Sequence, residues 1–229
     1  IGIKAGERTV QRLSPQKAPT GKYPVILAPN LAAGLIGNLN SAISGGSQYR
    51  KASFLLDALG QQVLPSWLTL RESSRMAGGL ASAYFDGEGV STRDNVFVES
   101  GSLASYILSS YSARKLGLET TGNAGGVHNL HLDAPMQPFP ALLAQMGNGF
   151  FITELMGQGV NGVTGDYSRG ASGFWVQDGE IAYPVAEFTL AGNLKDMFLN
   201  IVALADDIDV RSSIRSPSML LDSMTVAGQ

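Results

Sequence analysis

Short alternating runs of apolar and polar residues dominate the chain, and turn residues separate them. The runs KYPVIL, FFITEL and EFTLAG are rich in β-branched and aromatic residues, which predicts strands. GFWVQDGEIAYPV places two such runs around an Asp-Gly pair, and NVFVESGSLASYIL places two around a Ser-Gly pair. Both patterns predict β-hairpins. The end, SMLLDSMTVAGQ, predicts one or two closing strands.

Helical spacing occurs in two longer stretches. After Asn30, apolar residues recur every fourth position, at Leu31, Leu35, Leu39 and Ile43. This spacing predicts a helix with one buried face, which Asn30 would cap and Gly45 would end. The second stretch is NLKDMFLNIVALADDI, whose apolar residues at helical spacing are Leu194, Met197, Phe198, Ile201 and Leu204.

Shorter segments complete the pattern. SSYSARKLG and PFPALLAQMGNG each predict a short helix closed by glycine. Asp206, Asp207 and Asp209 would form a solvated acidic cluster at the end of the second long helix. The order strand, tight turn, strand, helix occurs twice, which is consistent with an internal duplication or with a common supersecondary unit.

Together these elements predict an α+β fold. We expect mainly antiparallel strands in a barrel-like or two-sheet core, with a few flanking helices. No linker divides the sequence, so residues 1–229 are expected to form one domain. Residues 1–20 are polar and are expected to be a lead-in from a preceding N-terminal domain.

Composition and charge exclude several classes of protein. Only 15% of residues are charged, the net charge is −3 and no basic run occurs, so we expect no nucleic-acid partner. The absence of cysteine excludes disulfides and thiolate ligands, which fits a cytoplasmic protein. The uncharged stretch 23–49 contains two prolines and several asparagines, so we expect no membrane span.

The two histidines are candidate metal ligands. His128 and His131 stand close to Asp133 in GGVHNLHLDA. Flanking glycines and Pro135 favour an extended chain, in which residues three apart point to opposite faces. Joint coordination is then difficult, so a loop that contacts peptide is the main hypothesis and a metal site is the alternative.

Two glycine-containing stretches supply further candidates. In GVTGDYSRGASGF, Asp166 and Arg169 would form an ion pair that buttresses the loop or would hold a substrate carboxylate. Tyr49 and Arg50 follow SGGSQ, another polar, glycine-containing turn. Neither stretch matches a phosphate-binding P-loop or a G-x-S-x-G nucleophile elbow.

Several long strings resemble one known family over nearly the whole chain. They are AISGGSQYRKASFLLDALGQQVLPSWLTL, SSYSARKLGLETTGNAGGVHN, ELMGQGVNGVTGDYSRGASGFWVQDGEIAYPV and LAGNLKDM. They are similar to the TldD/PmbA family of metallopeptidases, also described as modulators of DNA gyrase. The resemblance implies that the chain is the C-terminal half of a two-domain protein.

The resemblance also bears on zinc. TldD-type members carry an H-E-x-x-x-H helix, in which two histidines bind the metal and the glutamate acts as general base, and a cysteine ligand. Matched through APNLAAGLIGN, the motif positions fall on Ala28, Pro29 and Ala33, and the chain has no cysteine. We therefore expect no metal or other cofactor in this chain and zinc in a TldD-type partner.

The resemblance implies a partner and a substrate as well. PmbA/TldE-type members pair with TldD-type members, so we expect a heterodimer, or a homodimer, that degrades unfolded peptides such as a microcin precursor or a labile antitoxin. The residues expected to line the peptide chamber are His128, Asn129, Tyr49, Arg50, Asp166 and Arg169.

Two other functions remain open at this point. The chain would be an independent metallopeptidase if a different metal were held around His128 and His131. Alternatively, it would be a non-enzymatic scaffold or modulator of DNA gyrase.

Overall fold

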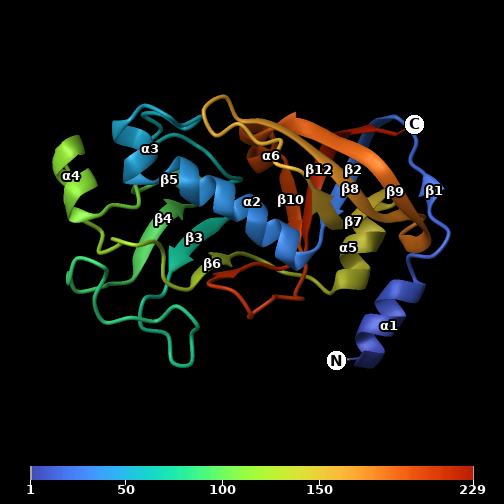
Figure 1. Ribbon diagram of the computed structural model, residues 1–229, viewed down its shortest axis with the longest axis horizontal. Helices are drawn as coiled ribbons and strands as arrows, with labels where there is room; N and C mark the ends of the chain where they lie inside the picture. Colours follow the sequence, from blue (N-terminus) through green and yellow to red (C-terminus); the bar gives the residue numbers. More distant parts are fainter. Residues whose placement is uncertain (1, 229) are drawn as a thin grey trace.

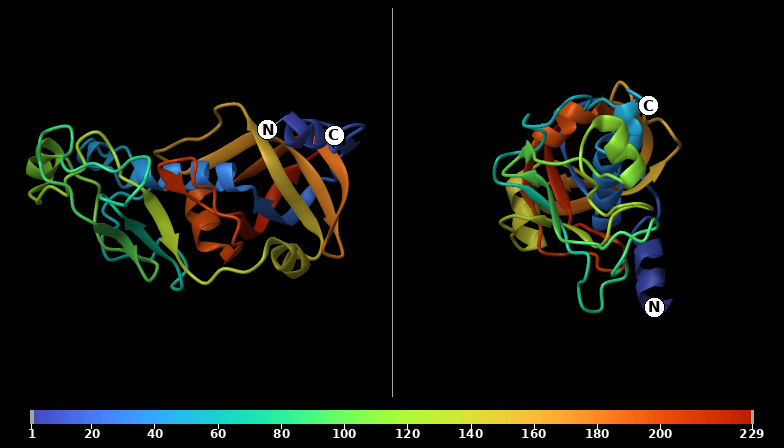
Figure 2. Two further views of the ribbon diagram at one scale, coloured as in Figure 1. Left: turned by 90° about the horizontal axis from the view of Figure 1, so that it is seen from below. Right: turned by 90° about the vertical axis from the view of Figure 1, so that its left-hand side faces the viewer.

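Two β-sheets and a set of short helices make up an elongated molecule (Figures 1 and 2). The computed structural model describes residues 2–228. One sheet closes into a barrel at one end, the second sheet lies toward the other end, and both chain termini are on the barrel side (Figure 1). The predicted α+β class with a barrel-like core is confirmed.

The barrel has five strands in a closed ring. β2 (Gly21–Leu27) pairs with β7 (Gly149–Met156), followed in order by β8 (Asp166–Gln177), β9 (Glu180–Asn193) and β12 (Met219–Ala227), which pairs with β2 again. The β2–β7 pair is parallel and the other pairs are antiparallel. A closed ring leaves no unpaired edge among these strands, which removes a template for aggregation.

Three residue pairs close the ring between β9 and β12. They are Ala191 with Thr225, Leu190 with Val226, and Thr189 with Ala227. Two shorter strands extend the sheet outside the ring. β1 (Gln16–Lys17) runs parallel to β9, and β10 (Ile201–Leu204) runs antiparallel to β12.

The second sheet has the order β11-β6-β3-β4-β5. Its strands are β3 (Thr69–Glu72), β4 (Asn95–Glu99), β5 (Ser102–Leu103), β6 (Leu130–Asp133) and β11 (Ile214–Arg215). The β6–β11 pair is parallel and the others are antiparallel. On β3, Leu70 and Glu72 are buried while Thr69 and Arg71 are partly exposed, so one face of this sheet packs on the core.

Helix α2 (Pro29–Ala42) connects the two sheets (Figure 1). Its buried residues are Ala32, Leu35, Ile36, Leu39 and Ala42. They belong to one apolar cluster that includes Phe150 of the barrel and Leu70 and Leu130 of the second sheet. The predicted buried helical face is therefore confirmed, and it joins both sheets in a single core.

The predicted limits of this helix are wrong. Asn30 lies inside the first turn, and the N-cap is Ala28, which makes no side-chain capping hydrogen bond. The helix ends at Ala42, and Gly45 begins the next helix, α3 (Gly45–Tyr49). Pro29 accounts for the early start, because its fixed φ suits the first helical position.

The other helices are short. They are α1 (Gly2–Val10), α4 (Ser110–Leu116), α5 (Phe139–Met146) and α6 (Leu194–Leu199). Ser109 and Ser112 form a reciprocal capping box at the start of α4, and Gly117 with φ of 67° ends it. The predictions for α4 and α5 are confirmed, and residues 2–20 contain α1 and β1.

The second long helix is only half present. α6 stops at Leu199, and Ile201–Leu204 continues as β10. Pairing of β10 with β12 has an irregularity between Ile201 and Ala203. Such a bulge lets residues three apart face the same side, which is why Ile201 and Leu204 are both buried. The three aspartates consequently follow a strand rather than a helix.

The predicted hairpins are confirmed. β8 and β9 meet at Asp178 and Gly179, with φ of 51° and 80°, as a type I′ turn requires at both central residues. β4 and β5 meet at Ser100 and Gly101, also with positive φ. Within residues 2–228, no helix is both long and apolar enough to span a bilayer.

A close approach between β7 and β8 predicts one sensitive glycine. A Cβ added to Gly173 would lie 2.1 Å from the carbonyl oxygen of Phe151. Gly173→Ala should lower the free energy of unfolding by about 1–3 kcal/mol, as overpacked sites do. Gly34→Ala is the control, since Gly34 is in α2 with open space around it and alanine favours helix. Denaturant unfolding measures the free energy of unfolding of both variants. Equal values for Gly173→Ala and Gly34→Ala would contradict the close approach between β7 and β8.

Candidate functional site

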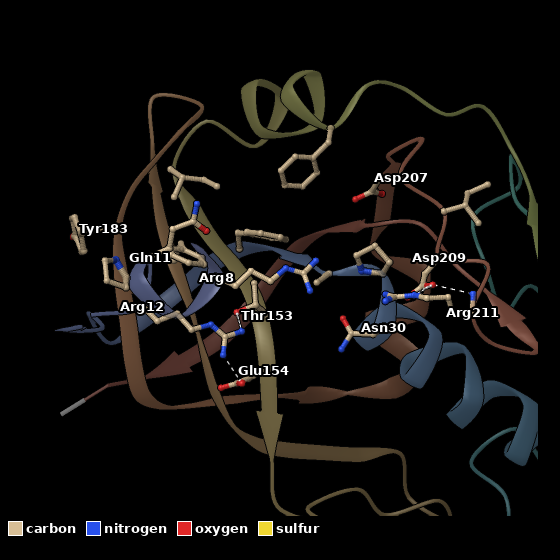
Figure 3. A pocket seen from close by; sticks show the side chains of 18 of the residues that line it. Arg8, Gln11, Arg12, Asn30, Thr153, Glu154, Tyr183, Asp207, Asp209 and Arg211 are labelled. Atoms are coloured by element: carbon tan, nitrogen blue, oxygen red, sulfur yellow. Dashed lines mark hydrogen bonds and ion pairs between the residues drawn. The ribbon is translucent and has the colours of Figure 1, made fainter. Parts of the chain in front are cut away.

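A large cleft of about 1170 Å³ lies at the barrel end of the molecule (Figure 3). Four parts of the chain form it: residues 8–12 at the end of α1, the start of α2, one part of the barrel wall with Phe139 of α5, and residues 207–211. The barrel wall contributes residues 151–154 of β7, Phe174 of β8 and residues 181–184 of β9. Its size is sufficient for several residues of an extended peptide, and ligand sites commonly occupy such concave surfaces.

The walls of the cleft are largely apolar. The apolar lining residues are Ala28, Pro29, Phe139, Phe151, Phe174, Ile181, Ala182, Tyr183, Pro184, Ile208 and Val210. Several of them are exposed in this chain, including Ile181, Ile208 and Val210. A ligand with apolar groups would remove this surface from water, which favours binding.

Charged residues stand at intervals on these walls. Arg12 donates to Oε1 of Glu154 at 2.5 Å and to the hydroxyl of Thr153 at 3.2 Å. Arg8 extends from α1 toward the side of the cleft that holds Asn30 and Asp209 (Figure 3). Three arginines therefore share the cleft with Glu154, Asp207 and Asp209, and their formal charges balance.

Asp209 is held as a carboxylate. Arg211 donates from Nε at 2.9 Å, from a terminal nitrogen at 2.7 Å and from its backbone N–H at 3.0 Å. These hydrogen bonds lower the pKa of Asp209 to about 2, and the positive charges of Arg211 and Arg8 act in the same direction. Asp207 is engaged separately by the backbone N–H and the hydroxyl of Ser218.

The cleft contains the positions where the family resemblance places a metal motif. Ala28 and Pro29 line it, and Ala33 follows one helical turn later on α2. None of these side chains has a metal-binding atom. Within residues 2–228, no group of three His, Cys, Asp or Glu side chains is arranged to hold a metal ion. The residues present therefore do not fit the zinc site of the resemblance.

The histidines lie away from the cleft, His131 in β6 of the second sheet and His128 in the loop before that strand. His128 Nδ1 is 3.2 Å from Oε1 of Glu72, whereas His131 Nδ1 faces the carbonyl oxygen of Asn129 at 3.3 Å. Asp133 accepts a hydrogen bond from Arg71. Within residues 2–228, His128, His131 and Asp133 form no such ligand group, and the alternative metal site here stays a prediction.

Glu72 organises the loops around His128. Its side chain is fully buried and accepts hydrogen bonds from Asn95 at 2.6 Å, Asn123 at 2.7 Å and the backbone N–H of His128 at 2.5 Å. A buried carboxylate is stable only when its oxygens are satisfied in this way. The alternation in TLRE is the one local signal for this site, since Glu72 falls on its apolar side.

A second buried acid supports the same region. Burial opposes ionisation of Asp86, but backbone N–H groups of Ala124, Val90 and Glu88 lower its pKa below the usual value, and His128 adds to this effect. Asp86 thus joins the loop of residues 86–90 to the loop of residues 123–128, and Glu72 of β3 joins the second loop to the sheet.

The remaining chamber candidates are dispersed. Asn129 is fully buried with φ of 42°, and its amide donates to the carbonyl of Ser73 and the hydroxyl of Ser82. Tyr49 and Arg50 lie at the end of α3, where the guanidinium stands 5.3 Å from the Tyr49 ring centroid.

Asp166 and Arg169 lie on β8, where each has its own partner. Asp166 accepts from the hydroxyl of Thr164, and Arg169 donates to the carbonyl of Met156. Arg169 also lines a smaller cavity of about 290 Å³. None of the six chamber candidates lines the large cleft, and their contact with peptide stays a prediction.

Comparison with known proteins identifies the family. The chain belongs to the PmbA/TldA metallopeptidase C-terminal domain family, whose sequence profile matches residues 20–228. It is 54% identical over 229 residues to Metalloprotease PmbA of Escherichia coli O157:H7, covering all of this chain and 51% of that protein. The chain thus spans about half the length of the curated relatives it matches.

Solved structures agree with this assignment. A Bacteroides thetaiotaomicron protein described as a candidate modulator of DNA gyrase is 30% identical and superposes with a TM-score of 0.94, over 100% of this chain and 52% of that one. TldE of Thermococcus kodakarensis, at 21% identity, shares the fold with a TM-score of 0.87 over 99% of this chain and 55% of its own.

The buried position of Glu72 generates a stability prediction. Glu72→Gln should lower the free energy of unfolding by about 2–3 kcal/mol, because the new NH2 group faces donors and the charge-assisted hydrogen bonds are lost. Glu99→Gln, at an exposed position of β4, is the matched control. Thermal and denaturant unfolding measure the difference, and equal losses in both variants would refute the role of Glu72.

The pKa of Asp209 generates a prediction for acid pH. Because the folded-state pKa is lowered from 3.8 to about 2, the carboxylate stabilises the fold fully above pH ~4 and this contribution is lost as pH falls toward ~2. Asp209→Asn should therefore show a smaller decrease of stability over that interval. Unfolding followed at a series of pH values tests this, and parallel curves for both proteins would contradict it.

Proposed function

We propose that the chain is part of a PmbA/TldE-type subunit that binds unfolded peptide, in the cytoplasm, for cleavage by a zinc-bearing TldD-type partner. One observation carries the proposal: Ala28 and Pro29, at the start of α2, line the large cleft, and their side chains have no metal-binding atoms. The family assignment supports a role in a metallopeptidase, and the missing ligands support a dependence on the partner.

The cleft has the properties that peptide binding requires. Its apolar walls suit side chains that are exposed in an unfolded polypeptide but buried in a folded one. Its balanced charges suit a peptide carrying either sign, since Arg8 can meet a carboxylate and Glu154 or Asp207 an ammonium group. Low sequence preference is the expected result, which is compatible with substrates as different as a microcin precursor and a labile antitoxin.

The contribution of this subunit is then binding and orientation. Zinc in the partner would polarise the scissile carbonyl and activate water. The residues of this chain would hold the peptide extended on both sides of the scissile bond. This would position the scissile bond against the catalytic groups of the partner and lower the entropic cost of the reaction.

Reconstitution tests the proposal. The protein containing this chain is mixed with a TldD-type partner and an unstructured peptide labelled at both ends, and cleavage, co-elution and zinc content are measured. We expect co-elution, faster cleavage by the mixture and no stoichiometric zinc in this protein alone. Equal cleavage by the partner alone without co-elution, or stoichiometric zinc that is lost in His128→Ala, would overturn the proposal.

A cleft variant locates the peptide. Val210→Asp places a carboxylate on an exposed apolar wall of the cleft, beside Asp209. We expect kcat/KM of the reconstituted complex to fall about tenfold, because one apolar contact with the peptide is lost. Val163→Asp is the matched control, because Val163 is equally exposed and lies outside the cleft. Equal rates for both variants would exclude the cleft as the binding site.

A further inference from the structure

Three basic side chains lie side by side on the second sheet. His131 of β6 is directly opposite Arg71 of β3 and, on its other side, opposite Arg215 of β11. Residues paired in this way project from the same face. The other face carries Leu70, Leu130 and Ile214, which pack toward the core, so the basic row lies on the outer face.

This row is accessible in the chain. The side chain of Arg71 is 42% exposed and that of the neighbouring Asp133 is 64% exposed. His131 and Arg215 are partly exposed. None of these residues lines the large cleft or the smaller cavity, so the row is distinct from the site proposed to bind substrate.

The row has fewer acceptors than donors. Arg71 donates from Nε to Asp133 at 3.1 Å, and His131 Nδ1 faces the carbonyl of Asn129. Nε of Arg215 is buried and has no hydrogen-bond partner. That atom is too buried for a ligand to reach. The two arginines share the row with one neighbouring carboxylate, that of Asp133, so one positive charge of the row is not balanced within it.

We propose that Arg71, His131 and Arg215 form a docking site for an acidic stretch of polypeptide. Guanidinium groups bind carboxylates through parallel hydrogen bonds, and adjacent strands place neighbouring side chains of the row about 4.8 Å apart. An open row suits a chain that carries several carboxylates better than it suits a single small ion. The proposal goes beyond the peptidase role and does not depend on it.

The surroundings favour polypeptide over nucleic acid. Thr69 and Val96 flank Arg71 on the same face, and neither offers an aromatic ring on which a base would stack. The protein is acidic overall, with a net charge of −3, so a local basic row would select acidic segments without attracting polyanions over the whole surface.

Binding of a labelled oligo-glutamate peptide to the protein containing this chain, followed by fluorescence anisotropy, tests the site. We expect saturable binding that weakens about fivefold in Arg71→Gln and about tenfold in Arg215→Gln. Asp133→Asn should tighten binding, because it removes the acidic group from the row. Arg114→Gln, the same charge change at an exposed position on α4, should leave the affinity unchanged.

Four results would overturn the docking site. They are absence of oligo-glutamate binding, equal affinity in wild type and both arginine variants, weaker binding in Asp133→Asn, and tighter binding of an oligo-thymidylate of equal length. Thermal unfolding of each variant is measured in parallel. If Arg215→Gln fails to fold, the exposed substitutions Arg71→Gln and Asp133→Asn decide, because their expected effects have opposite signs.

Discussion

Backbone pairing between β9 and β12 closes the barrel, and the place of the cleft depends on this closure. With the ring complete, β2 is fixed between β7 and β12, and the chain leaves the barrel at Ala28, whose N–H donates to the carbonyl of Ile152. Helix α2 must then begin beside the middle of β7, next to Ile152. Its N-terminal turn becomes a wall of the cleft, and its apolar side reaches the second sheet.

Elements with local signals were predictable from the sequence. An Asp-Gly pair between alternating runs defined the β8–β9 hairpin, and serine and glycine defined the limits of α4. The stretch from Ile201 to Leu204 misled because a bulge gives a strand the spacing of a helix turn. For the barrel, only the fold class was predicted. The strand pairs that close the ring were not, because the pairing of strands remote in sequence depends on the whole core.

The cleft was harder to predict than the fold. Its polar contacts join residues far apart, such as Arg12 with Glu154 and Asp207 with Ser218, and no short motif contains both partners. Sequence patterns favoured histidines and glycine-rich turns as site residues. In the structure, His128 contacts the carboxylate of Glu72, and Asn129 donates a hydrogen bond to a loop carbonyl. The residue types at the positions of the family's metal motif were more informative, because the side chains of Ala28 and Pro29 cannot bind a metal whatever surrounds them.

The ring has a consequence for synthesis of the protein. Because β2 precedes the other four strands of the ring and β12 follows them all, the barrel cannot close on the ribosome until β12 has emerged. Until then β2 and β9 each expose backbone groups that β12 will later pair, and such edges attract other chains. Pairing of this kind is also slow to form. Nascent chains of this protein should therefore be clients of chaperones that shield unpaired strands.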